Sequence, residues 1–170
     1  MTLTETFRGK KLGWKQDSFF SKDYKLYADN DLIGTINFSK FLSTKGDITI
    51  LGHELEADSP SMWKSRMEMR EKKSGKLVAE LKVEKFMGES EITIGTKSFR
   101  FATTLFQKRF LIKSEAGATL IEFAMTGWFK TECEIIPEPT FISVEEFPIL
   151  LVFVWYLIIR ISSRHAVAGV

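Results

Sequence analysis

Short stretches of alternating apolar and polar residues dominate the middle of the chain. From Lys76 to Glu84 the odd-numbered positions are apolar and their neighbours are mostly charged, which is the period of a half-buried β-strand. The residues predicted to face the core are Leu77, Ala79, Leu81 and Val83. The segment from Arg66 to Arg70 alternates in the same way, and the turn sequence Lys73-Ser-Gly75 between the two predicts a β-hairpin.

Strands and turns of this kind continue from residue 19 to residue 142 and predict about ten to twelve short strands. Turn sequences at Asp29-Asn-Asp31 and Ala116-Gly117 predict two further hairpins. The strand region is predicted to end at Pro137-Glu-Pro139, because proline cannot donate a hydrogen bond within a central strand.

The predicted hairpins recur at a constant step. Apolar residues lie 43 positions apart in two series, Tyr24, Met67, Phe110 and Leu26, Met69, Ile112. A period of this length predicts a repeated unit of about four strands. Evenly spaced hairpins in any all-β protein would also produce some of these coincidences, so both interpretations stay open.

The end of the chain carries an uncharged, strongly apolar run from Phe147 to Ile159. Apolar side chains cover every side of a helical wheel drawn over it, so a helix here must be enclosed by protein or by lipid. Ser143 and Glu146 fit the capping box that starts a helix. Pro148 then removes one early helical hydrogen bond, or else the helix begins later than Ser143 suggests.

The length of this run favours enclosure by protein. It has 13 residues, roughly 20 Å as a helix, whereas a bilayer core is about 30 Å thick and needs about 20 apolar residues. A barrel of about ten to twelve strands is too wide for its own side chains to fill. The apolar helix is therefore predicted to occupy the centre of the barrel.

The predicted fold class is mainly β with one helix (α+β): a closed antiparallel β-barrel of about twelve strands around a buried apolar C-terminal helix. A length of 170 residues suits one domain. The single domain covers residues 1–170, with strands in 19–142, the central helix in 143–163 and a tail in 164–170.

Composition narrows the function classes. The 24 basic and 22 acidic residues leave a net charge of +2, which does not indicate a nucleic-acid-binding protein. The single cysteine, Cys133, excludes an internal disulfide framework and suits a reducing compartment. Residues 1–11 contain no apolar signal segment. A cytoplasmic location is expected, with a membrane-associated one as the alternative.

The order of elements resembles the tubby C-terminal-like superfamily, which includes the tubby domain, the LURP-one-related proteins and the phospholipid scramblases. The resemblance is carried by the hairpins Tyr24–Gly34, Met67–Val78 and Phe110–Ile121 and by the helix Glu146–Ile161. It implies a twelve-stranded barrel around that helix. The phosphoinositide-binding residues of tubby and the acidic calcium-binding segment of the scramblases have no match here, and likeness of fold does not transfer function.

One basic surface is predicted as a ligand site. If Met67 and Met69 point inward, Lys64, Arg66, Arg70 and Lys72 share the outer face of one strand and its turn. With Lys73 and Lys76 beside them they form the candidate site for an anionic lipid headgroup, each cation contributing about 1 kcal/mol near an acidic membrane. Glu68, Glu71, Glu80 and Glu84 lie close by, so a solvated surface of mixed charge is the alternative.

No catalytic residue, metal site or cofactor is predicted. His53 and His165 are too far apart in the chain for metal-ligand spacing. Cys133 lacks a neighbouring base, so a structural role is expected for it. Glu54, Glu56 and Asp58 are expected to lie in an exposed loop between Gly52 and Pro60.

The sequence therefore predicts a non-enzymatic binding or scaffold module. Two ligand classes fit it, a phosphoinositide or other anionic lipid surface and a protein partner. The alternative is a tail-anchored membrane protein with residues 147–161 in the bilayer and Arg160 at the interface. Ligand identity, biological process and oligomeric state stay open.

Overall fold

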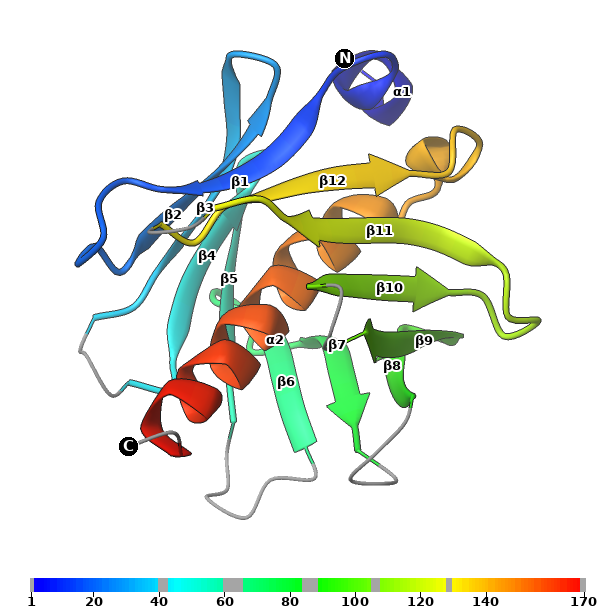
Figure 1. The fold of residues 1–170 in the computed structure, drawn as a ribbon. Helices are drawn as coiled ribbons and strands as arrows, with labels where there is room; N and C mark the ends of the chain where they lie inside the picture. Colours follow the sequence, from blue (N-terminus) through cyan, green and yellow to red (C-terminus); the bar gives the residue numbers. More distant parts are fainter. Residues whose placement is uncertain are drawn as a thin grey trace.

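A computed structural model describes residues 2–39, 43–59, 66–83, 89–104, 108–127 and 130–168, with side chains up to residue 162. The chain forms a barrel of strands around one long helix (Figure 1). The strands are β1 (Leu12–Gln16), β2 (Asp23–Ala28), β3 (Asp31–Asn37), β4 (Gly46–Ile50), β5 (His53–Asp58), β6 (Arg66–Glu71), β7 (Leu77–Lys82), β8 (Ser90–Ile94), β9 (Lys97–Thr104), β10 (Arg109–Lys113), β11 (Thr119–Met125) and β12 (Cys133–Pro137). The helices are α1 (Leu3–Phe7), the 3₁₀ helix η2 (Phe141–Ser143) and α2 (Phe147–Ala168).

The twelve strands follow one another around the barrel, and each pairs with its neighbours in the antiparallel sense. The barrel closes where β1 pairs with β12, with Gly13 opposite Glu134 and Trp14 opposite Cys133. A Cβ on Gly13 would lie 2.8 Å from the carbonyl oxygen of Cys133, so this seam requires glycine. The predicted closed antiparallel barrel is confirmed. The first strand, however, precedes residue 19, where the strand region was expected to begin.

Side chains of β6 and β7 alternate between the interior and the outside as predicted, except that Leu77 is exposed and Glu80 is buried. Met67, Met69, Ala79 and Leu81 are buried. Leu77 is 37 % exposed because a register shift after Met69 pairs it with Arg70. Residues that pair across two strands share one face of the sheet, so Leu77 follows Arg70 outward.

The register shifts confirm the repeat. They fall at Leu26/Tyr27 between β2 and β3, at Met69/Arg70 between β6 and β7, and at Ile112/Lys113 between β10 and β11. These positions are 43 residues apart. The barrel is therefore built from three four-strand units that carry the same bulge at the same place.

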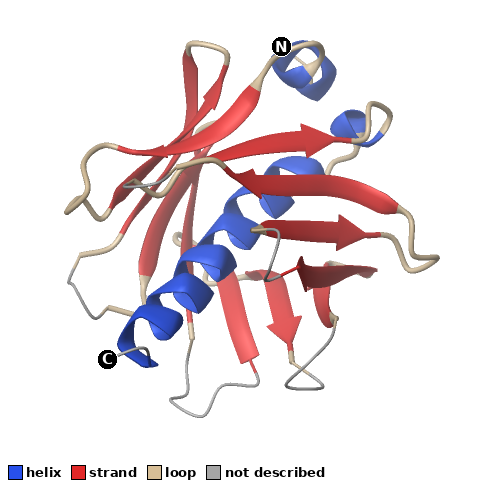
Figure 2. Cartoon of the chain, viewed as in Figure 1, coloured by secondary structure: helices blue, strands red, loops and turns tan. Residues whose placement is uncertain are grey.

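Helix α2 runs through the centre of the barrel (Figures 1 and 2). Every residue from Leu150 to Ile158 is fully buried. The ring of Trp155 stacks on Trp14 with centroids 5.7 Å apart, and the indole nitrogen of Trp14 donates to the carbonyl oxygen of Leu151 at 3.3 Å. The apolar run is thus enclosed by protein, as predicted. Within the described residues, no helix is both long and apolar enough to cross a bilayer.

The predicted start of this helix at Ser143 is wrong, and the alternative of a later start is confirmed. Ser143 ends η2, and its hydroxyl donates to the carbonyl oxygen of Thr140 at 2.9 Å instead of capping α2. Because α2 begins at Phe147, Pro148 lies in its first turn, where a missing N–H leaves no helical hydrogen bond unmade. The helix also extends to Ala168, beyond the predicted end at residue 163.

Candidate functional site

The interior of the barrel is occupied by the side chains of α2 and of the inward strand positions. A ligand would therefore meet the protein on its outer surface. Three features of the molecule bear on function: the predicted basic face of β6 and β7, an apolar groove beside α1, and the environment of Cys133.

The strand part of the basic face is neutralised by acidic neighbours. Arg66 contacts Glu68 at 2.8 Å and Glu80 at 2.5 Å, and Arg70 contacts Glu68 at 2.8 Å. Glu68 and Glu80 are directly opposite each other on β6 and β7. The two arginines thus bridge a pair of like charges that would otherwise repel across the sheet.

The remaining lysines of the predicted site differ in whether they have an acidic partner. Lys72 lies 2.7 Å from Asp47, and this hydrogen bond raises the pKa of Lys72. Lys73 and Lys76 are exposed in the turn between β6 and β7. Lys64 lies outside the described residues. Binding of an anionic headgroup here stays a prediction. Three of the six predicted cations, Arg66, Arg70 and Lys72, form ion pairs with carboxylates.

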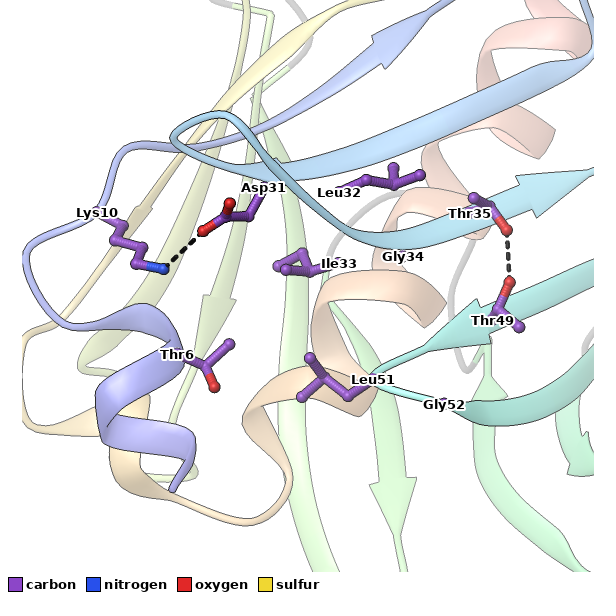
Figure 3. A pocket seen from close by; sticks show the side chains of 10 residues that line it. All are labelled: Thr6, Lys10, Asp31, Leu32, Ile33, Gly34, Thr35, Thr49, Leu51 and Gly52. Atoms are coloured by element: carbon purple, nitrogen blue, oxygen red, sulfur yellow. Dashed lines mark hydrogen bonds and ion pairs between the residues drawn. The ribbon is translucent and has the colours of Figure 1, made fainter. Parts of the chain in front are cut away.

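An apolar groove of about 400 Å³ lies beside α1, at the end of the barrel where β2 turns into β3 and β4 into β5 (Figure 3). Its lining comes from three parts of the chain, namely Thr6, Lys10, Asp31, Leu32, Ile33, Gly34, Thr35, Thr49, Leu51 and Gly52. The groove has the size of a small-ligand site. No sequence motif marks it, because its residues come together only when α1 packs beside the two turns.

The groove has an apolar middle and polar ends. Leu32 is 52 % exposed, and Ile33 and Leu51 are half-buried against the core. At one end the ammonium of Lys10 donates to Asp31 at 3.1 Å, and at the other the hydroxyls of Thr35 and Thr49 are 2.5 Å apart (Figure 3). An apolar ligand that carries a polar group at one end matches this arrangement.

Leu51 holds an unusual backbone conformation at the edge of this groove. Leu51 and Gly52 form the two-residue turn between Ile50 and His53, with φ of 47° and 84°. Such a turn favours Asn-Gly, and a residue with a bulky side chain in the left-handed region costs roughly 1–2 kcal/mol. The unfavourable leucine points to a function, since strained residues concentrate at functional sites.

The acidic residues after this turn do not form the loop that was expected. Glu54, Glu56 and Asp58 lie on β5, on the face opposite the buried Leu55 and Ala57. Glu56 pairs with Lys45 at 3.3 Å, and Asp58 accepts a hydrogen bond from Thr44 at 2.7 Å. The segment is a strand because β5 pairs with both β4 and β6, although Gly52 and Pro60 are residues typical of loops.

Cys133 is buried at the closing seam of the barrel. Burial raises the pKa of its thiol from the ordinary 9.0 to about 12. A thiol is nucleophilic only as the thiolate, so Cys133 is unsuited to covalent catalysis at neutral pH. Among the described residues, no three His, Cys, Asp or Glu side chains gather where they could hold a metal ion.

This pKa shift predicts a loss of stability in alkaline solution. The unfolded thiol ionises above about pH 9 while the folded thiol stays protonated up to about pH 12, so in this interval the unfolded state gains stability. We expect the free energy of unfolding to fall by on the order of 1 kcal/mol per pH unit there. Urea unfolding across this range measures it. Cys133→Ala should show a flatter dependence, and an equal slope in both proteins would contradict the assignment.

Comparison with known proteins bears on the fold alone. No family model matches the chain, and no curated protein matches it. A solved structure, that of a LURP-one-related protein from Arabidopsis thaliana, is similar with a TM-score of 0.59. The similarity covers 92 % of this chain and 95 % of that one at 12 % sequence identity. The likeness supports the barrel fold that the order of elements predicted.

Proposed function

We propose that this protein is a non-enzymatic binding module, and that the groove beside α1 accepts an apolar segment of a partner protein. The observation that carries the proposal is Leu51, an apolar side chain kept at the groove in a backbone conformation that disfavours it. A turn selected only for folding would carry asparagine or glycine here.

The chemistry of the lining supports a peptide ligand. The exposed Leu32 and the half-buried Ile33 and Leu51 offer an apolar surface for one or two side chains. Lys10 and Asp31 are exposed enough to exchange their mutual contact for a charge on the ligand, since an exposed ion pair contributes only about 0–1 kcal/mol. The hydroxyls of Thr35 and Thr49 provide a polar contact at the opposite end.

The non-enzymatic part of the proposal is supported by Cys133, the one cysteine. It is buried, its pKa is raised, and it lies on β12 rather than among the groove residues. The groove itself is lined by one lysine, one aspartate, three threonines, and otherwise by apolar side chains and glycines. Such a lining suits recognition of a ligand more than its chemical conversion.

The test is a peptide selection against the groove. Peptides that bind the intact protein are selected from a displayed library of short random peptides. The affinities of the selected peptides are then measured by titration. We expect apolar-rich peptides whose binding shifts the NMR signals of Ile33 and Leu51. In Leu51→Asn the affinity should fall at least about tenfold, because an apolar contact worth about 1.5 kcal/mol or more is lost.

The same variant separates binding from folding. Relief of the strain at position 51 offsets the lost packing of the leucine, so we expect the free energy of unfolding to change by less than about 1 kcal/mol. Leu77→Asn, on the outer face of β7, is the matched control and should leave peptide affinity unchanged. Peptides that bind Leu51→Asn as tightly as the wild type, or a failure to select any peptide, would remove the groove as the ligand site.

A further inference from the structure

Two adjacent phenylalanines project into solvent from the connection between β1 and β2. Phe19 is 59 % exposed and Phe20 is 89 % exposed. Their rings contact each other edge to face, with centroids 5.0 Å apart. Exposure of two neighbouring aromatic rings to water is unfavourable, and an apolar surface patch of this kind marks an interaction site.

The connection that carries these rings is held in place by hydrogen bonds. The side-chain amide of Gln16, itself only 8 % exposed, donates to the carbonyl oxygen of Ser21 at 2.6 Å. The side-chain oxygen of Gln16 accepts from the backbone N–H of Thr131 at 2.9 Å. The ammonium of Lys130 donates to the carbonyl oxygen of Asp17 at 3.2 Å. The connection is thus tied to the segment before β12, so the rings are presented in a fixed place.

The groove beside α1 is a second place where apolar surface is exposed. Among the described residues, the exposed large apolar side chains are Phe19, Phe20, Leu32, Leu77 and Ile136. Leu32 lines the groove together with the half-buried Ile33 and Leu51. The chain therefore carries both an apolar projection and an apolar hollow.

The hollow matches the projection in size. A cavity of about 150 Å³ in a protein core holds one benzene molecule, so two phenylalanine rings need roughly 300 Å³. The groove measures about 400 Å³. It therefore has room for both rings.

The hollow also matches the projection in the order of its polar and apolar parts. The two rings are flanked by Ser18 on one side and Ser21 on the other. The groove has the Lys10–Asp31 ion pair at one end, an apolar middle, and the hydroxyls of Thr35 and Thr49 at the other end (Figure 3). A short polar side chain on each side of the rings would meet a polar group at each end.

The rings of one molecule do not reach the groove of the same molecule. Lys10 of the groove precedes β1, and the rings follow β1. This strand has five residues, which at about 3.3 Å per residue hold the two features roughly 16 Å apart. In Figure 1 the connection after β1 lies at the left edge of the barrel and α1 at the top. A contact between the two features therefore joins two molecules.

Both features lie on one flank of the barrel. The rings connect β1 with β2, and the groove is lined by β3 and by the turn between β4 and β5. These strands are neighbours in the barrel. Because the strands are antiparallel, the connection after β1 and the turn after β4 lie at opposite ends. A two-fold axis across this flank brings the rings of each copy to the groove of the other.

The area of contact favours this reciprocal arrangement over a contact between rings alone. Two aromatic side chains bury roughly 300–500 Å², whereas a specific interface buries about 800 Å² on each partner. Rings packed on rings therefore fall short. In the reciprocal arrangement each copy contributes its groove as well as its rings, which roughly doubles the buried area.

We propose that two copies of this chain form a weak two-fold dimer, in which Phe19 and Phe20 of each copy occupy the groove beside α1 of the other. The inference rests on the proposed function of the groove and names a segment that the groove binds. An apolar segment of a partner protein then competes with the second copy for the same groove. Dimer formation thereby regulates access to the groove.

The test is sedimentation velocity of the intact protein at concentrations from roughly 1 µM to 1 mM, where small interfaces associate. We expect a monomer–dimer equilibrium that stops at the dimer, because reciprocal contacts close the assembly. The double variant Phe19→Ser, Phe20→Ser should dimerise at least about a hundredfold more weakly, from tenfold or more for each ring. Leu32→Asp, which places a charge in the apolar middle of the groove, should weaken dimer formation by at least about tenfold.

A mixture of these two variants distinguishes the proposed contact from other modes of association. The phenylalanine variant keeps its groove, and Leu32→Asp keeps its rings. One ring-to-groove contact is therefore restored when one molecule of each variant pairs. We expect the mixture to associate at least about tenfold more tightly than either variant alone. Contacts between rings alone would not be restored by mixing.

Leu77→Ser is the matched control for these substitutions. Leu77 is 37 % exposed on β7, which does not adjoin the flank formed by β1 to β4. This variant should dimerise as the wild type does. Adding a saturating amount of a peptide selected for the groove should convert the wild-type dimer to monomer. The phenylalanine variant should bind that peptide at least as tightly as the wild type.

The results that refute the dimer differ from those that refute the groove. A wild type that stays monomeric throughout this range, yet binds the selected peptides, would refute the dimer alone. A mixture that associates no more tightly than its components would show that the rings do not enter the groove. Association that continues past the dimer would refute the two-fold arrangement. Loss of both dimer formation and peptide binding in the wild type would remove the groove as a site, and both proposals with it.

Discussion

A chain that ends at Glu146 is expected to lack a cooperative unfolding transition. This truncation removes α2, whose residues from Leu150 to Ile158 are all fully buried. Each large buried apolar side chain contributes about 1.5–3 kcal/mol, so their sum exceeds the roughly 5–15 kcal/mol by which a typical domain is stable. The strands alone would enclose an empty barrel. Thermal melts followed by circular dichroism measure the outcome.

A chain that ends at Ser163 is the matched control for this truncation. It keeps every residue of α2 that is buried in the described part of the chain, and it retains the half-buried Ile161 and the exposed Ser162. We expect it to melt cooperatively, close to the full-length protein. If the chain ending at Glu146 also melts cooperatively with native strand content, α2 is an appendage of the fold and its central role is refuted.

Val154→Asp is expected to destabilise the fold severely. Val154 is fully buried near the middle of α2 and belongs to the hydrophobic core. An unpaired carboxylate in such a place must be protonated or must draw water into the core, and either costs several kcal/mol. We expect the free energy of unfolding to fall by more than about 4 kcal/mol, which is exceptional for one substitution. Urea titration of the purified variant gives the value.

Two other substitutions separate the effect of the buried charge on stability from the effect of the changed side-chain volume. Val154→Ala removes only part of the side chain and should cost about 1–3 kcal/mol through the cavity it leaves. Ile161→Asp lies where α2 becomes half-buried and should cost less than Val154→Asp. A Val154→Asp protein as stable as the alanine variant would mean that position 154 is reached by water, contrary to the enclosed helix.

The basic face of β6 illustrates what alternation alone can predict. The inward direction of Met67 and Met69 followed from the period of the strand, and so did the outward direction of Arg66. The pairing of Arg66 with Glu80 did not, because it depends on the register between β6 and β7. The bulge that sets this register also turned Leu77 outward, against the pattern.

The groove could not be predicted from the sequence for a related reason. Leu51-Gly52 was visible as a turn, but its position beside α1 depends on how the barrel closes.

The sequence by itself determined the antiparallel strands and the enclosure of the apolar C-terminal helix, because these depend on local periodicity and on the length of one run. It left the 43-residue repeat as one of two interpretations, and the register shifts between paired strands decided it. The tertiary structure decided the start of α2 at Phe147, the ion pairs that neutralise Arg66, and the grouping of the groove residues. Those features depend on contacts between residues far apart in the chain, whose geometry is set by register and barrel closure.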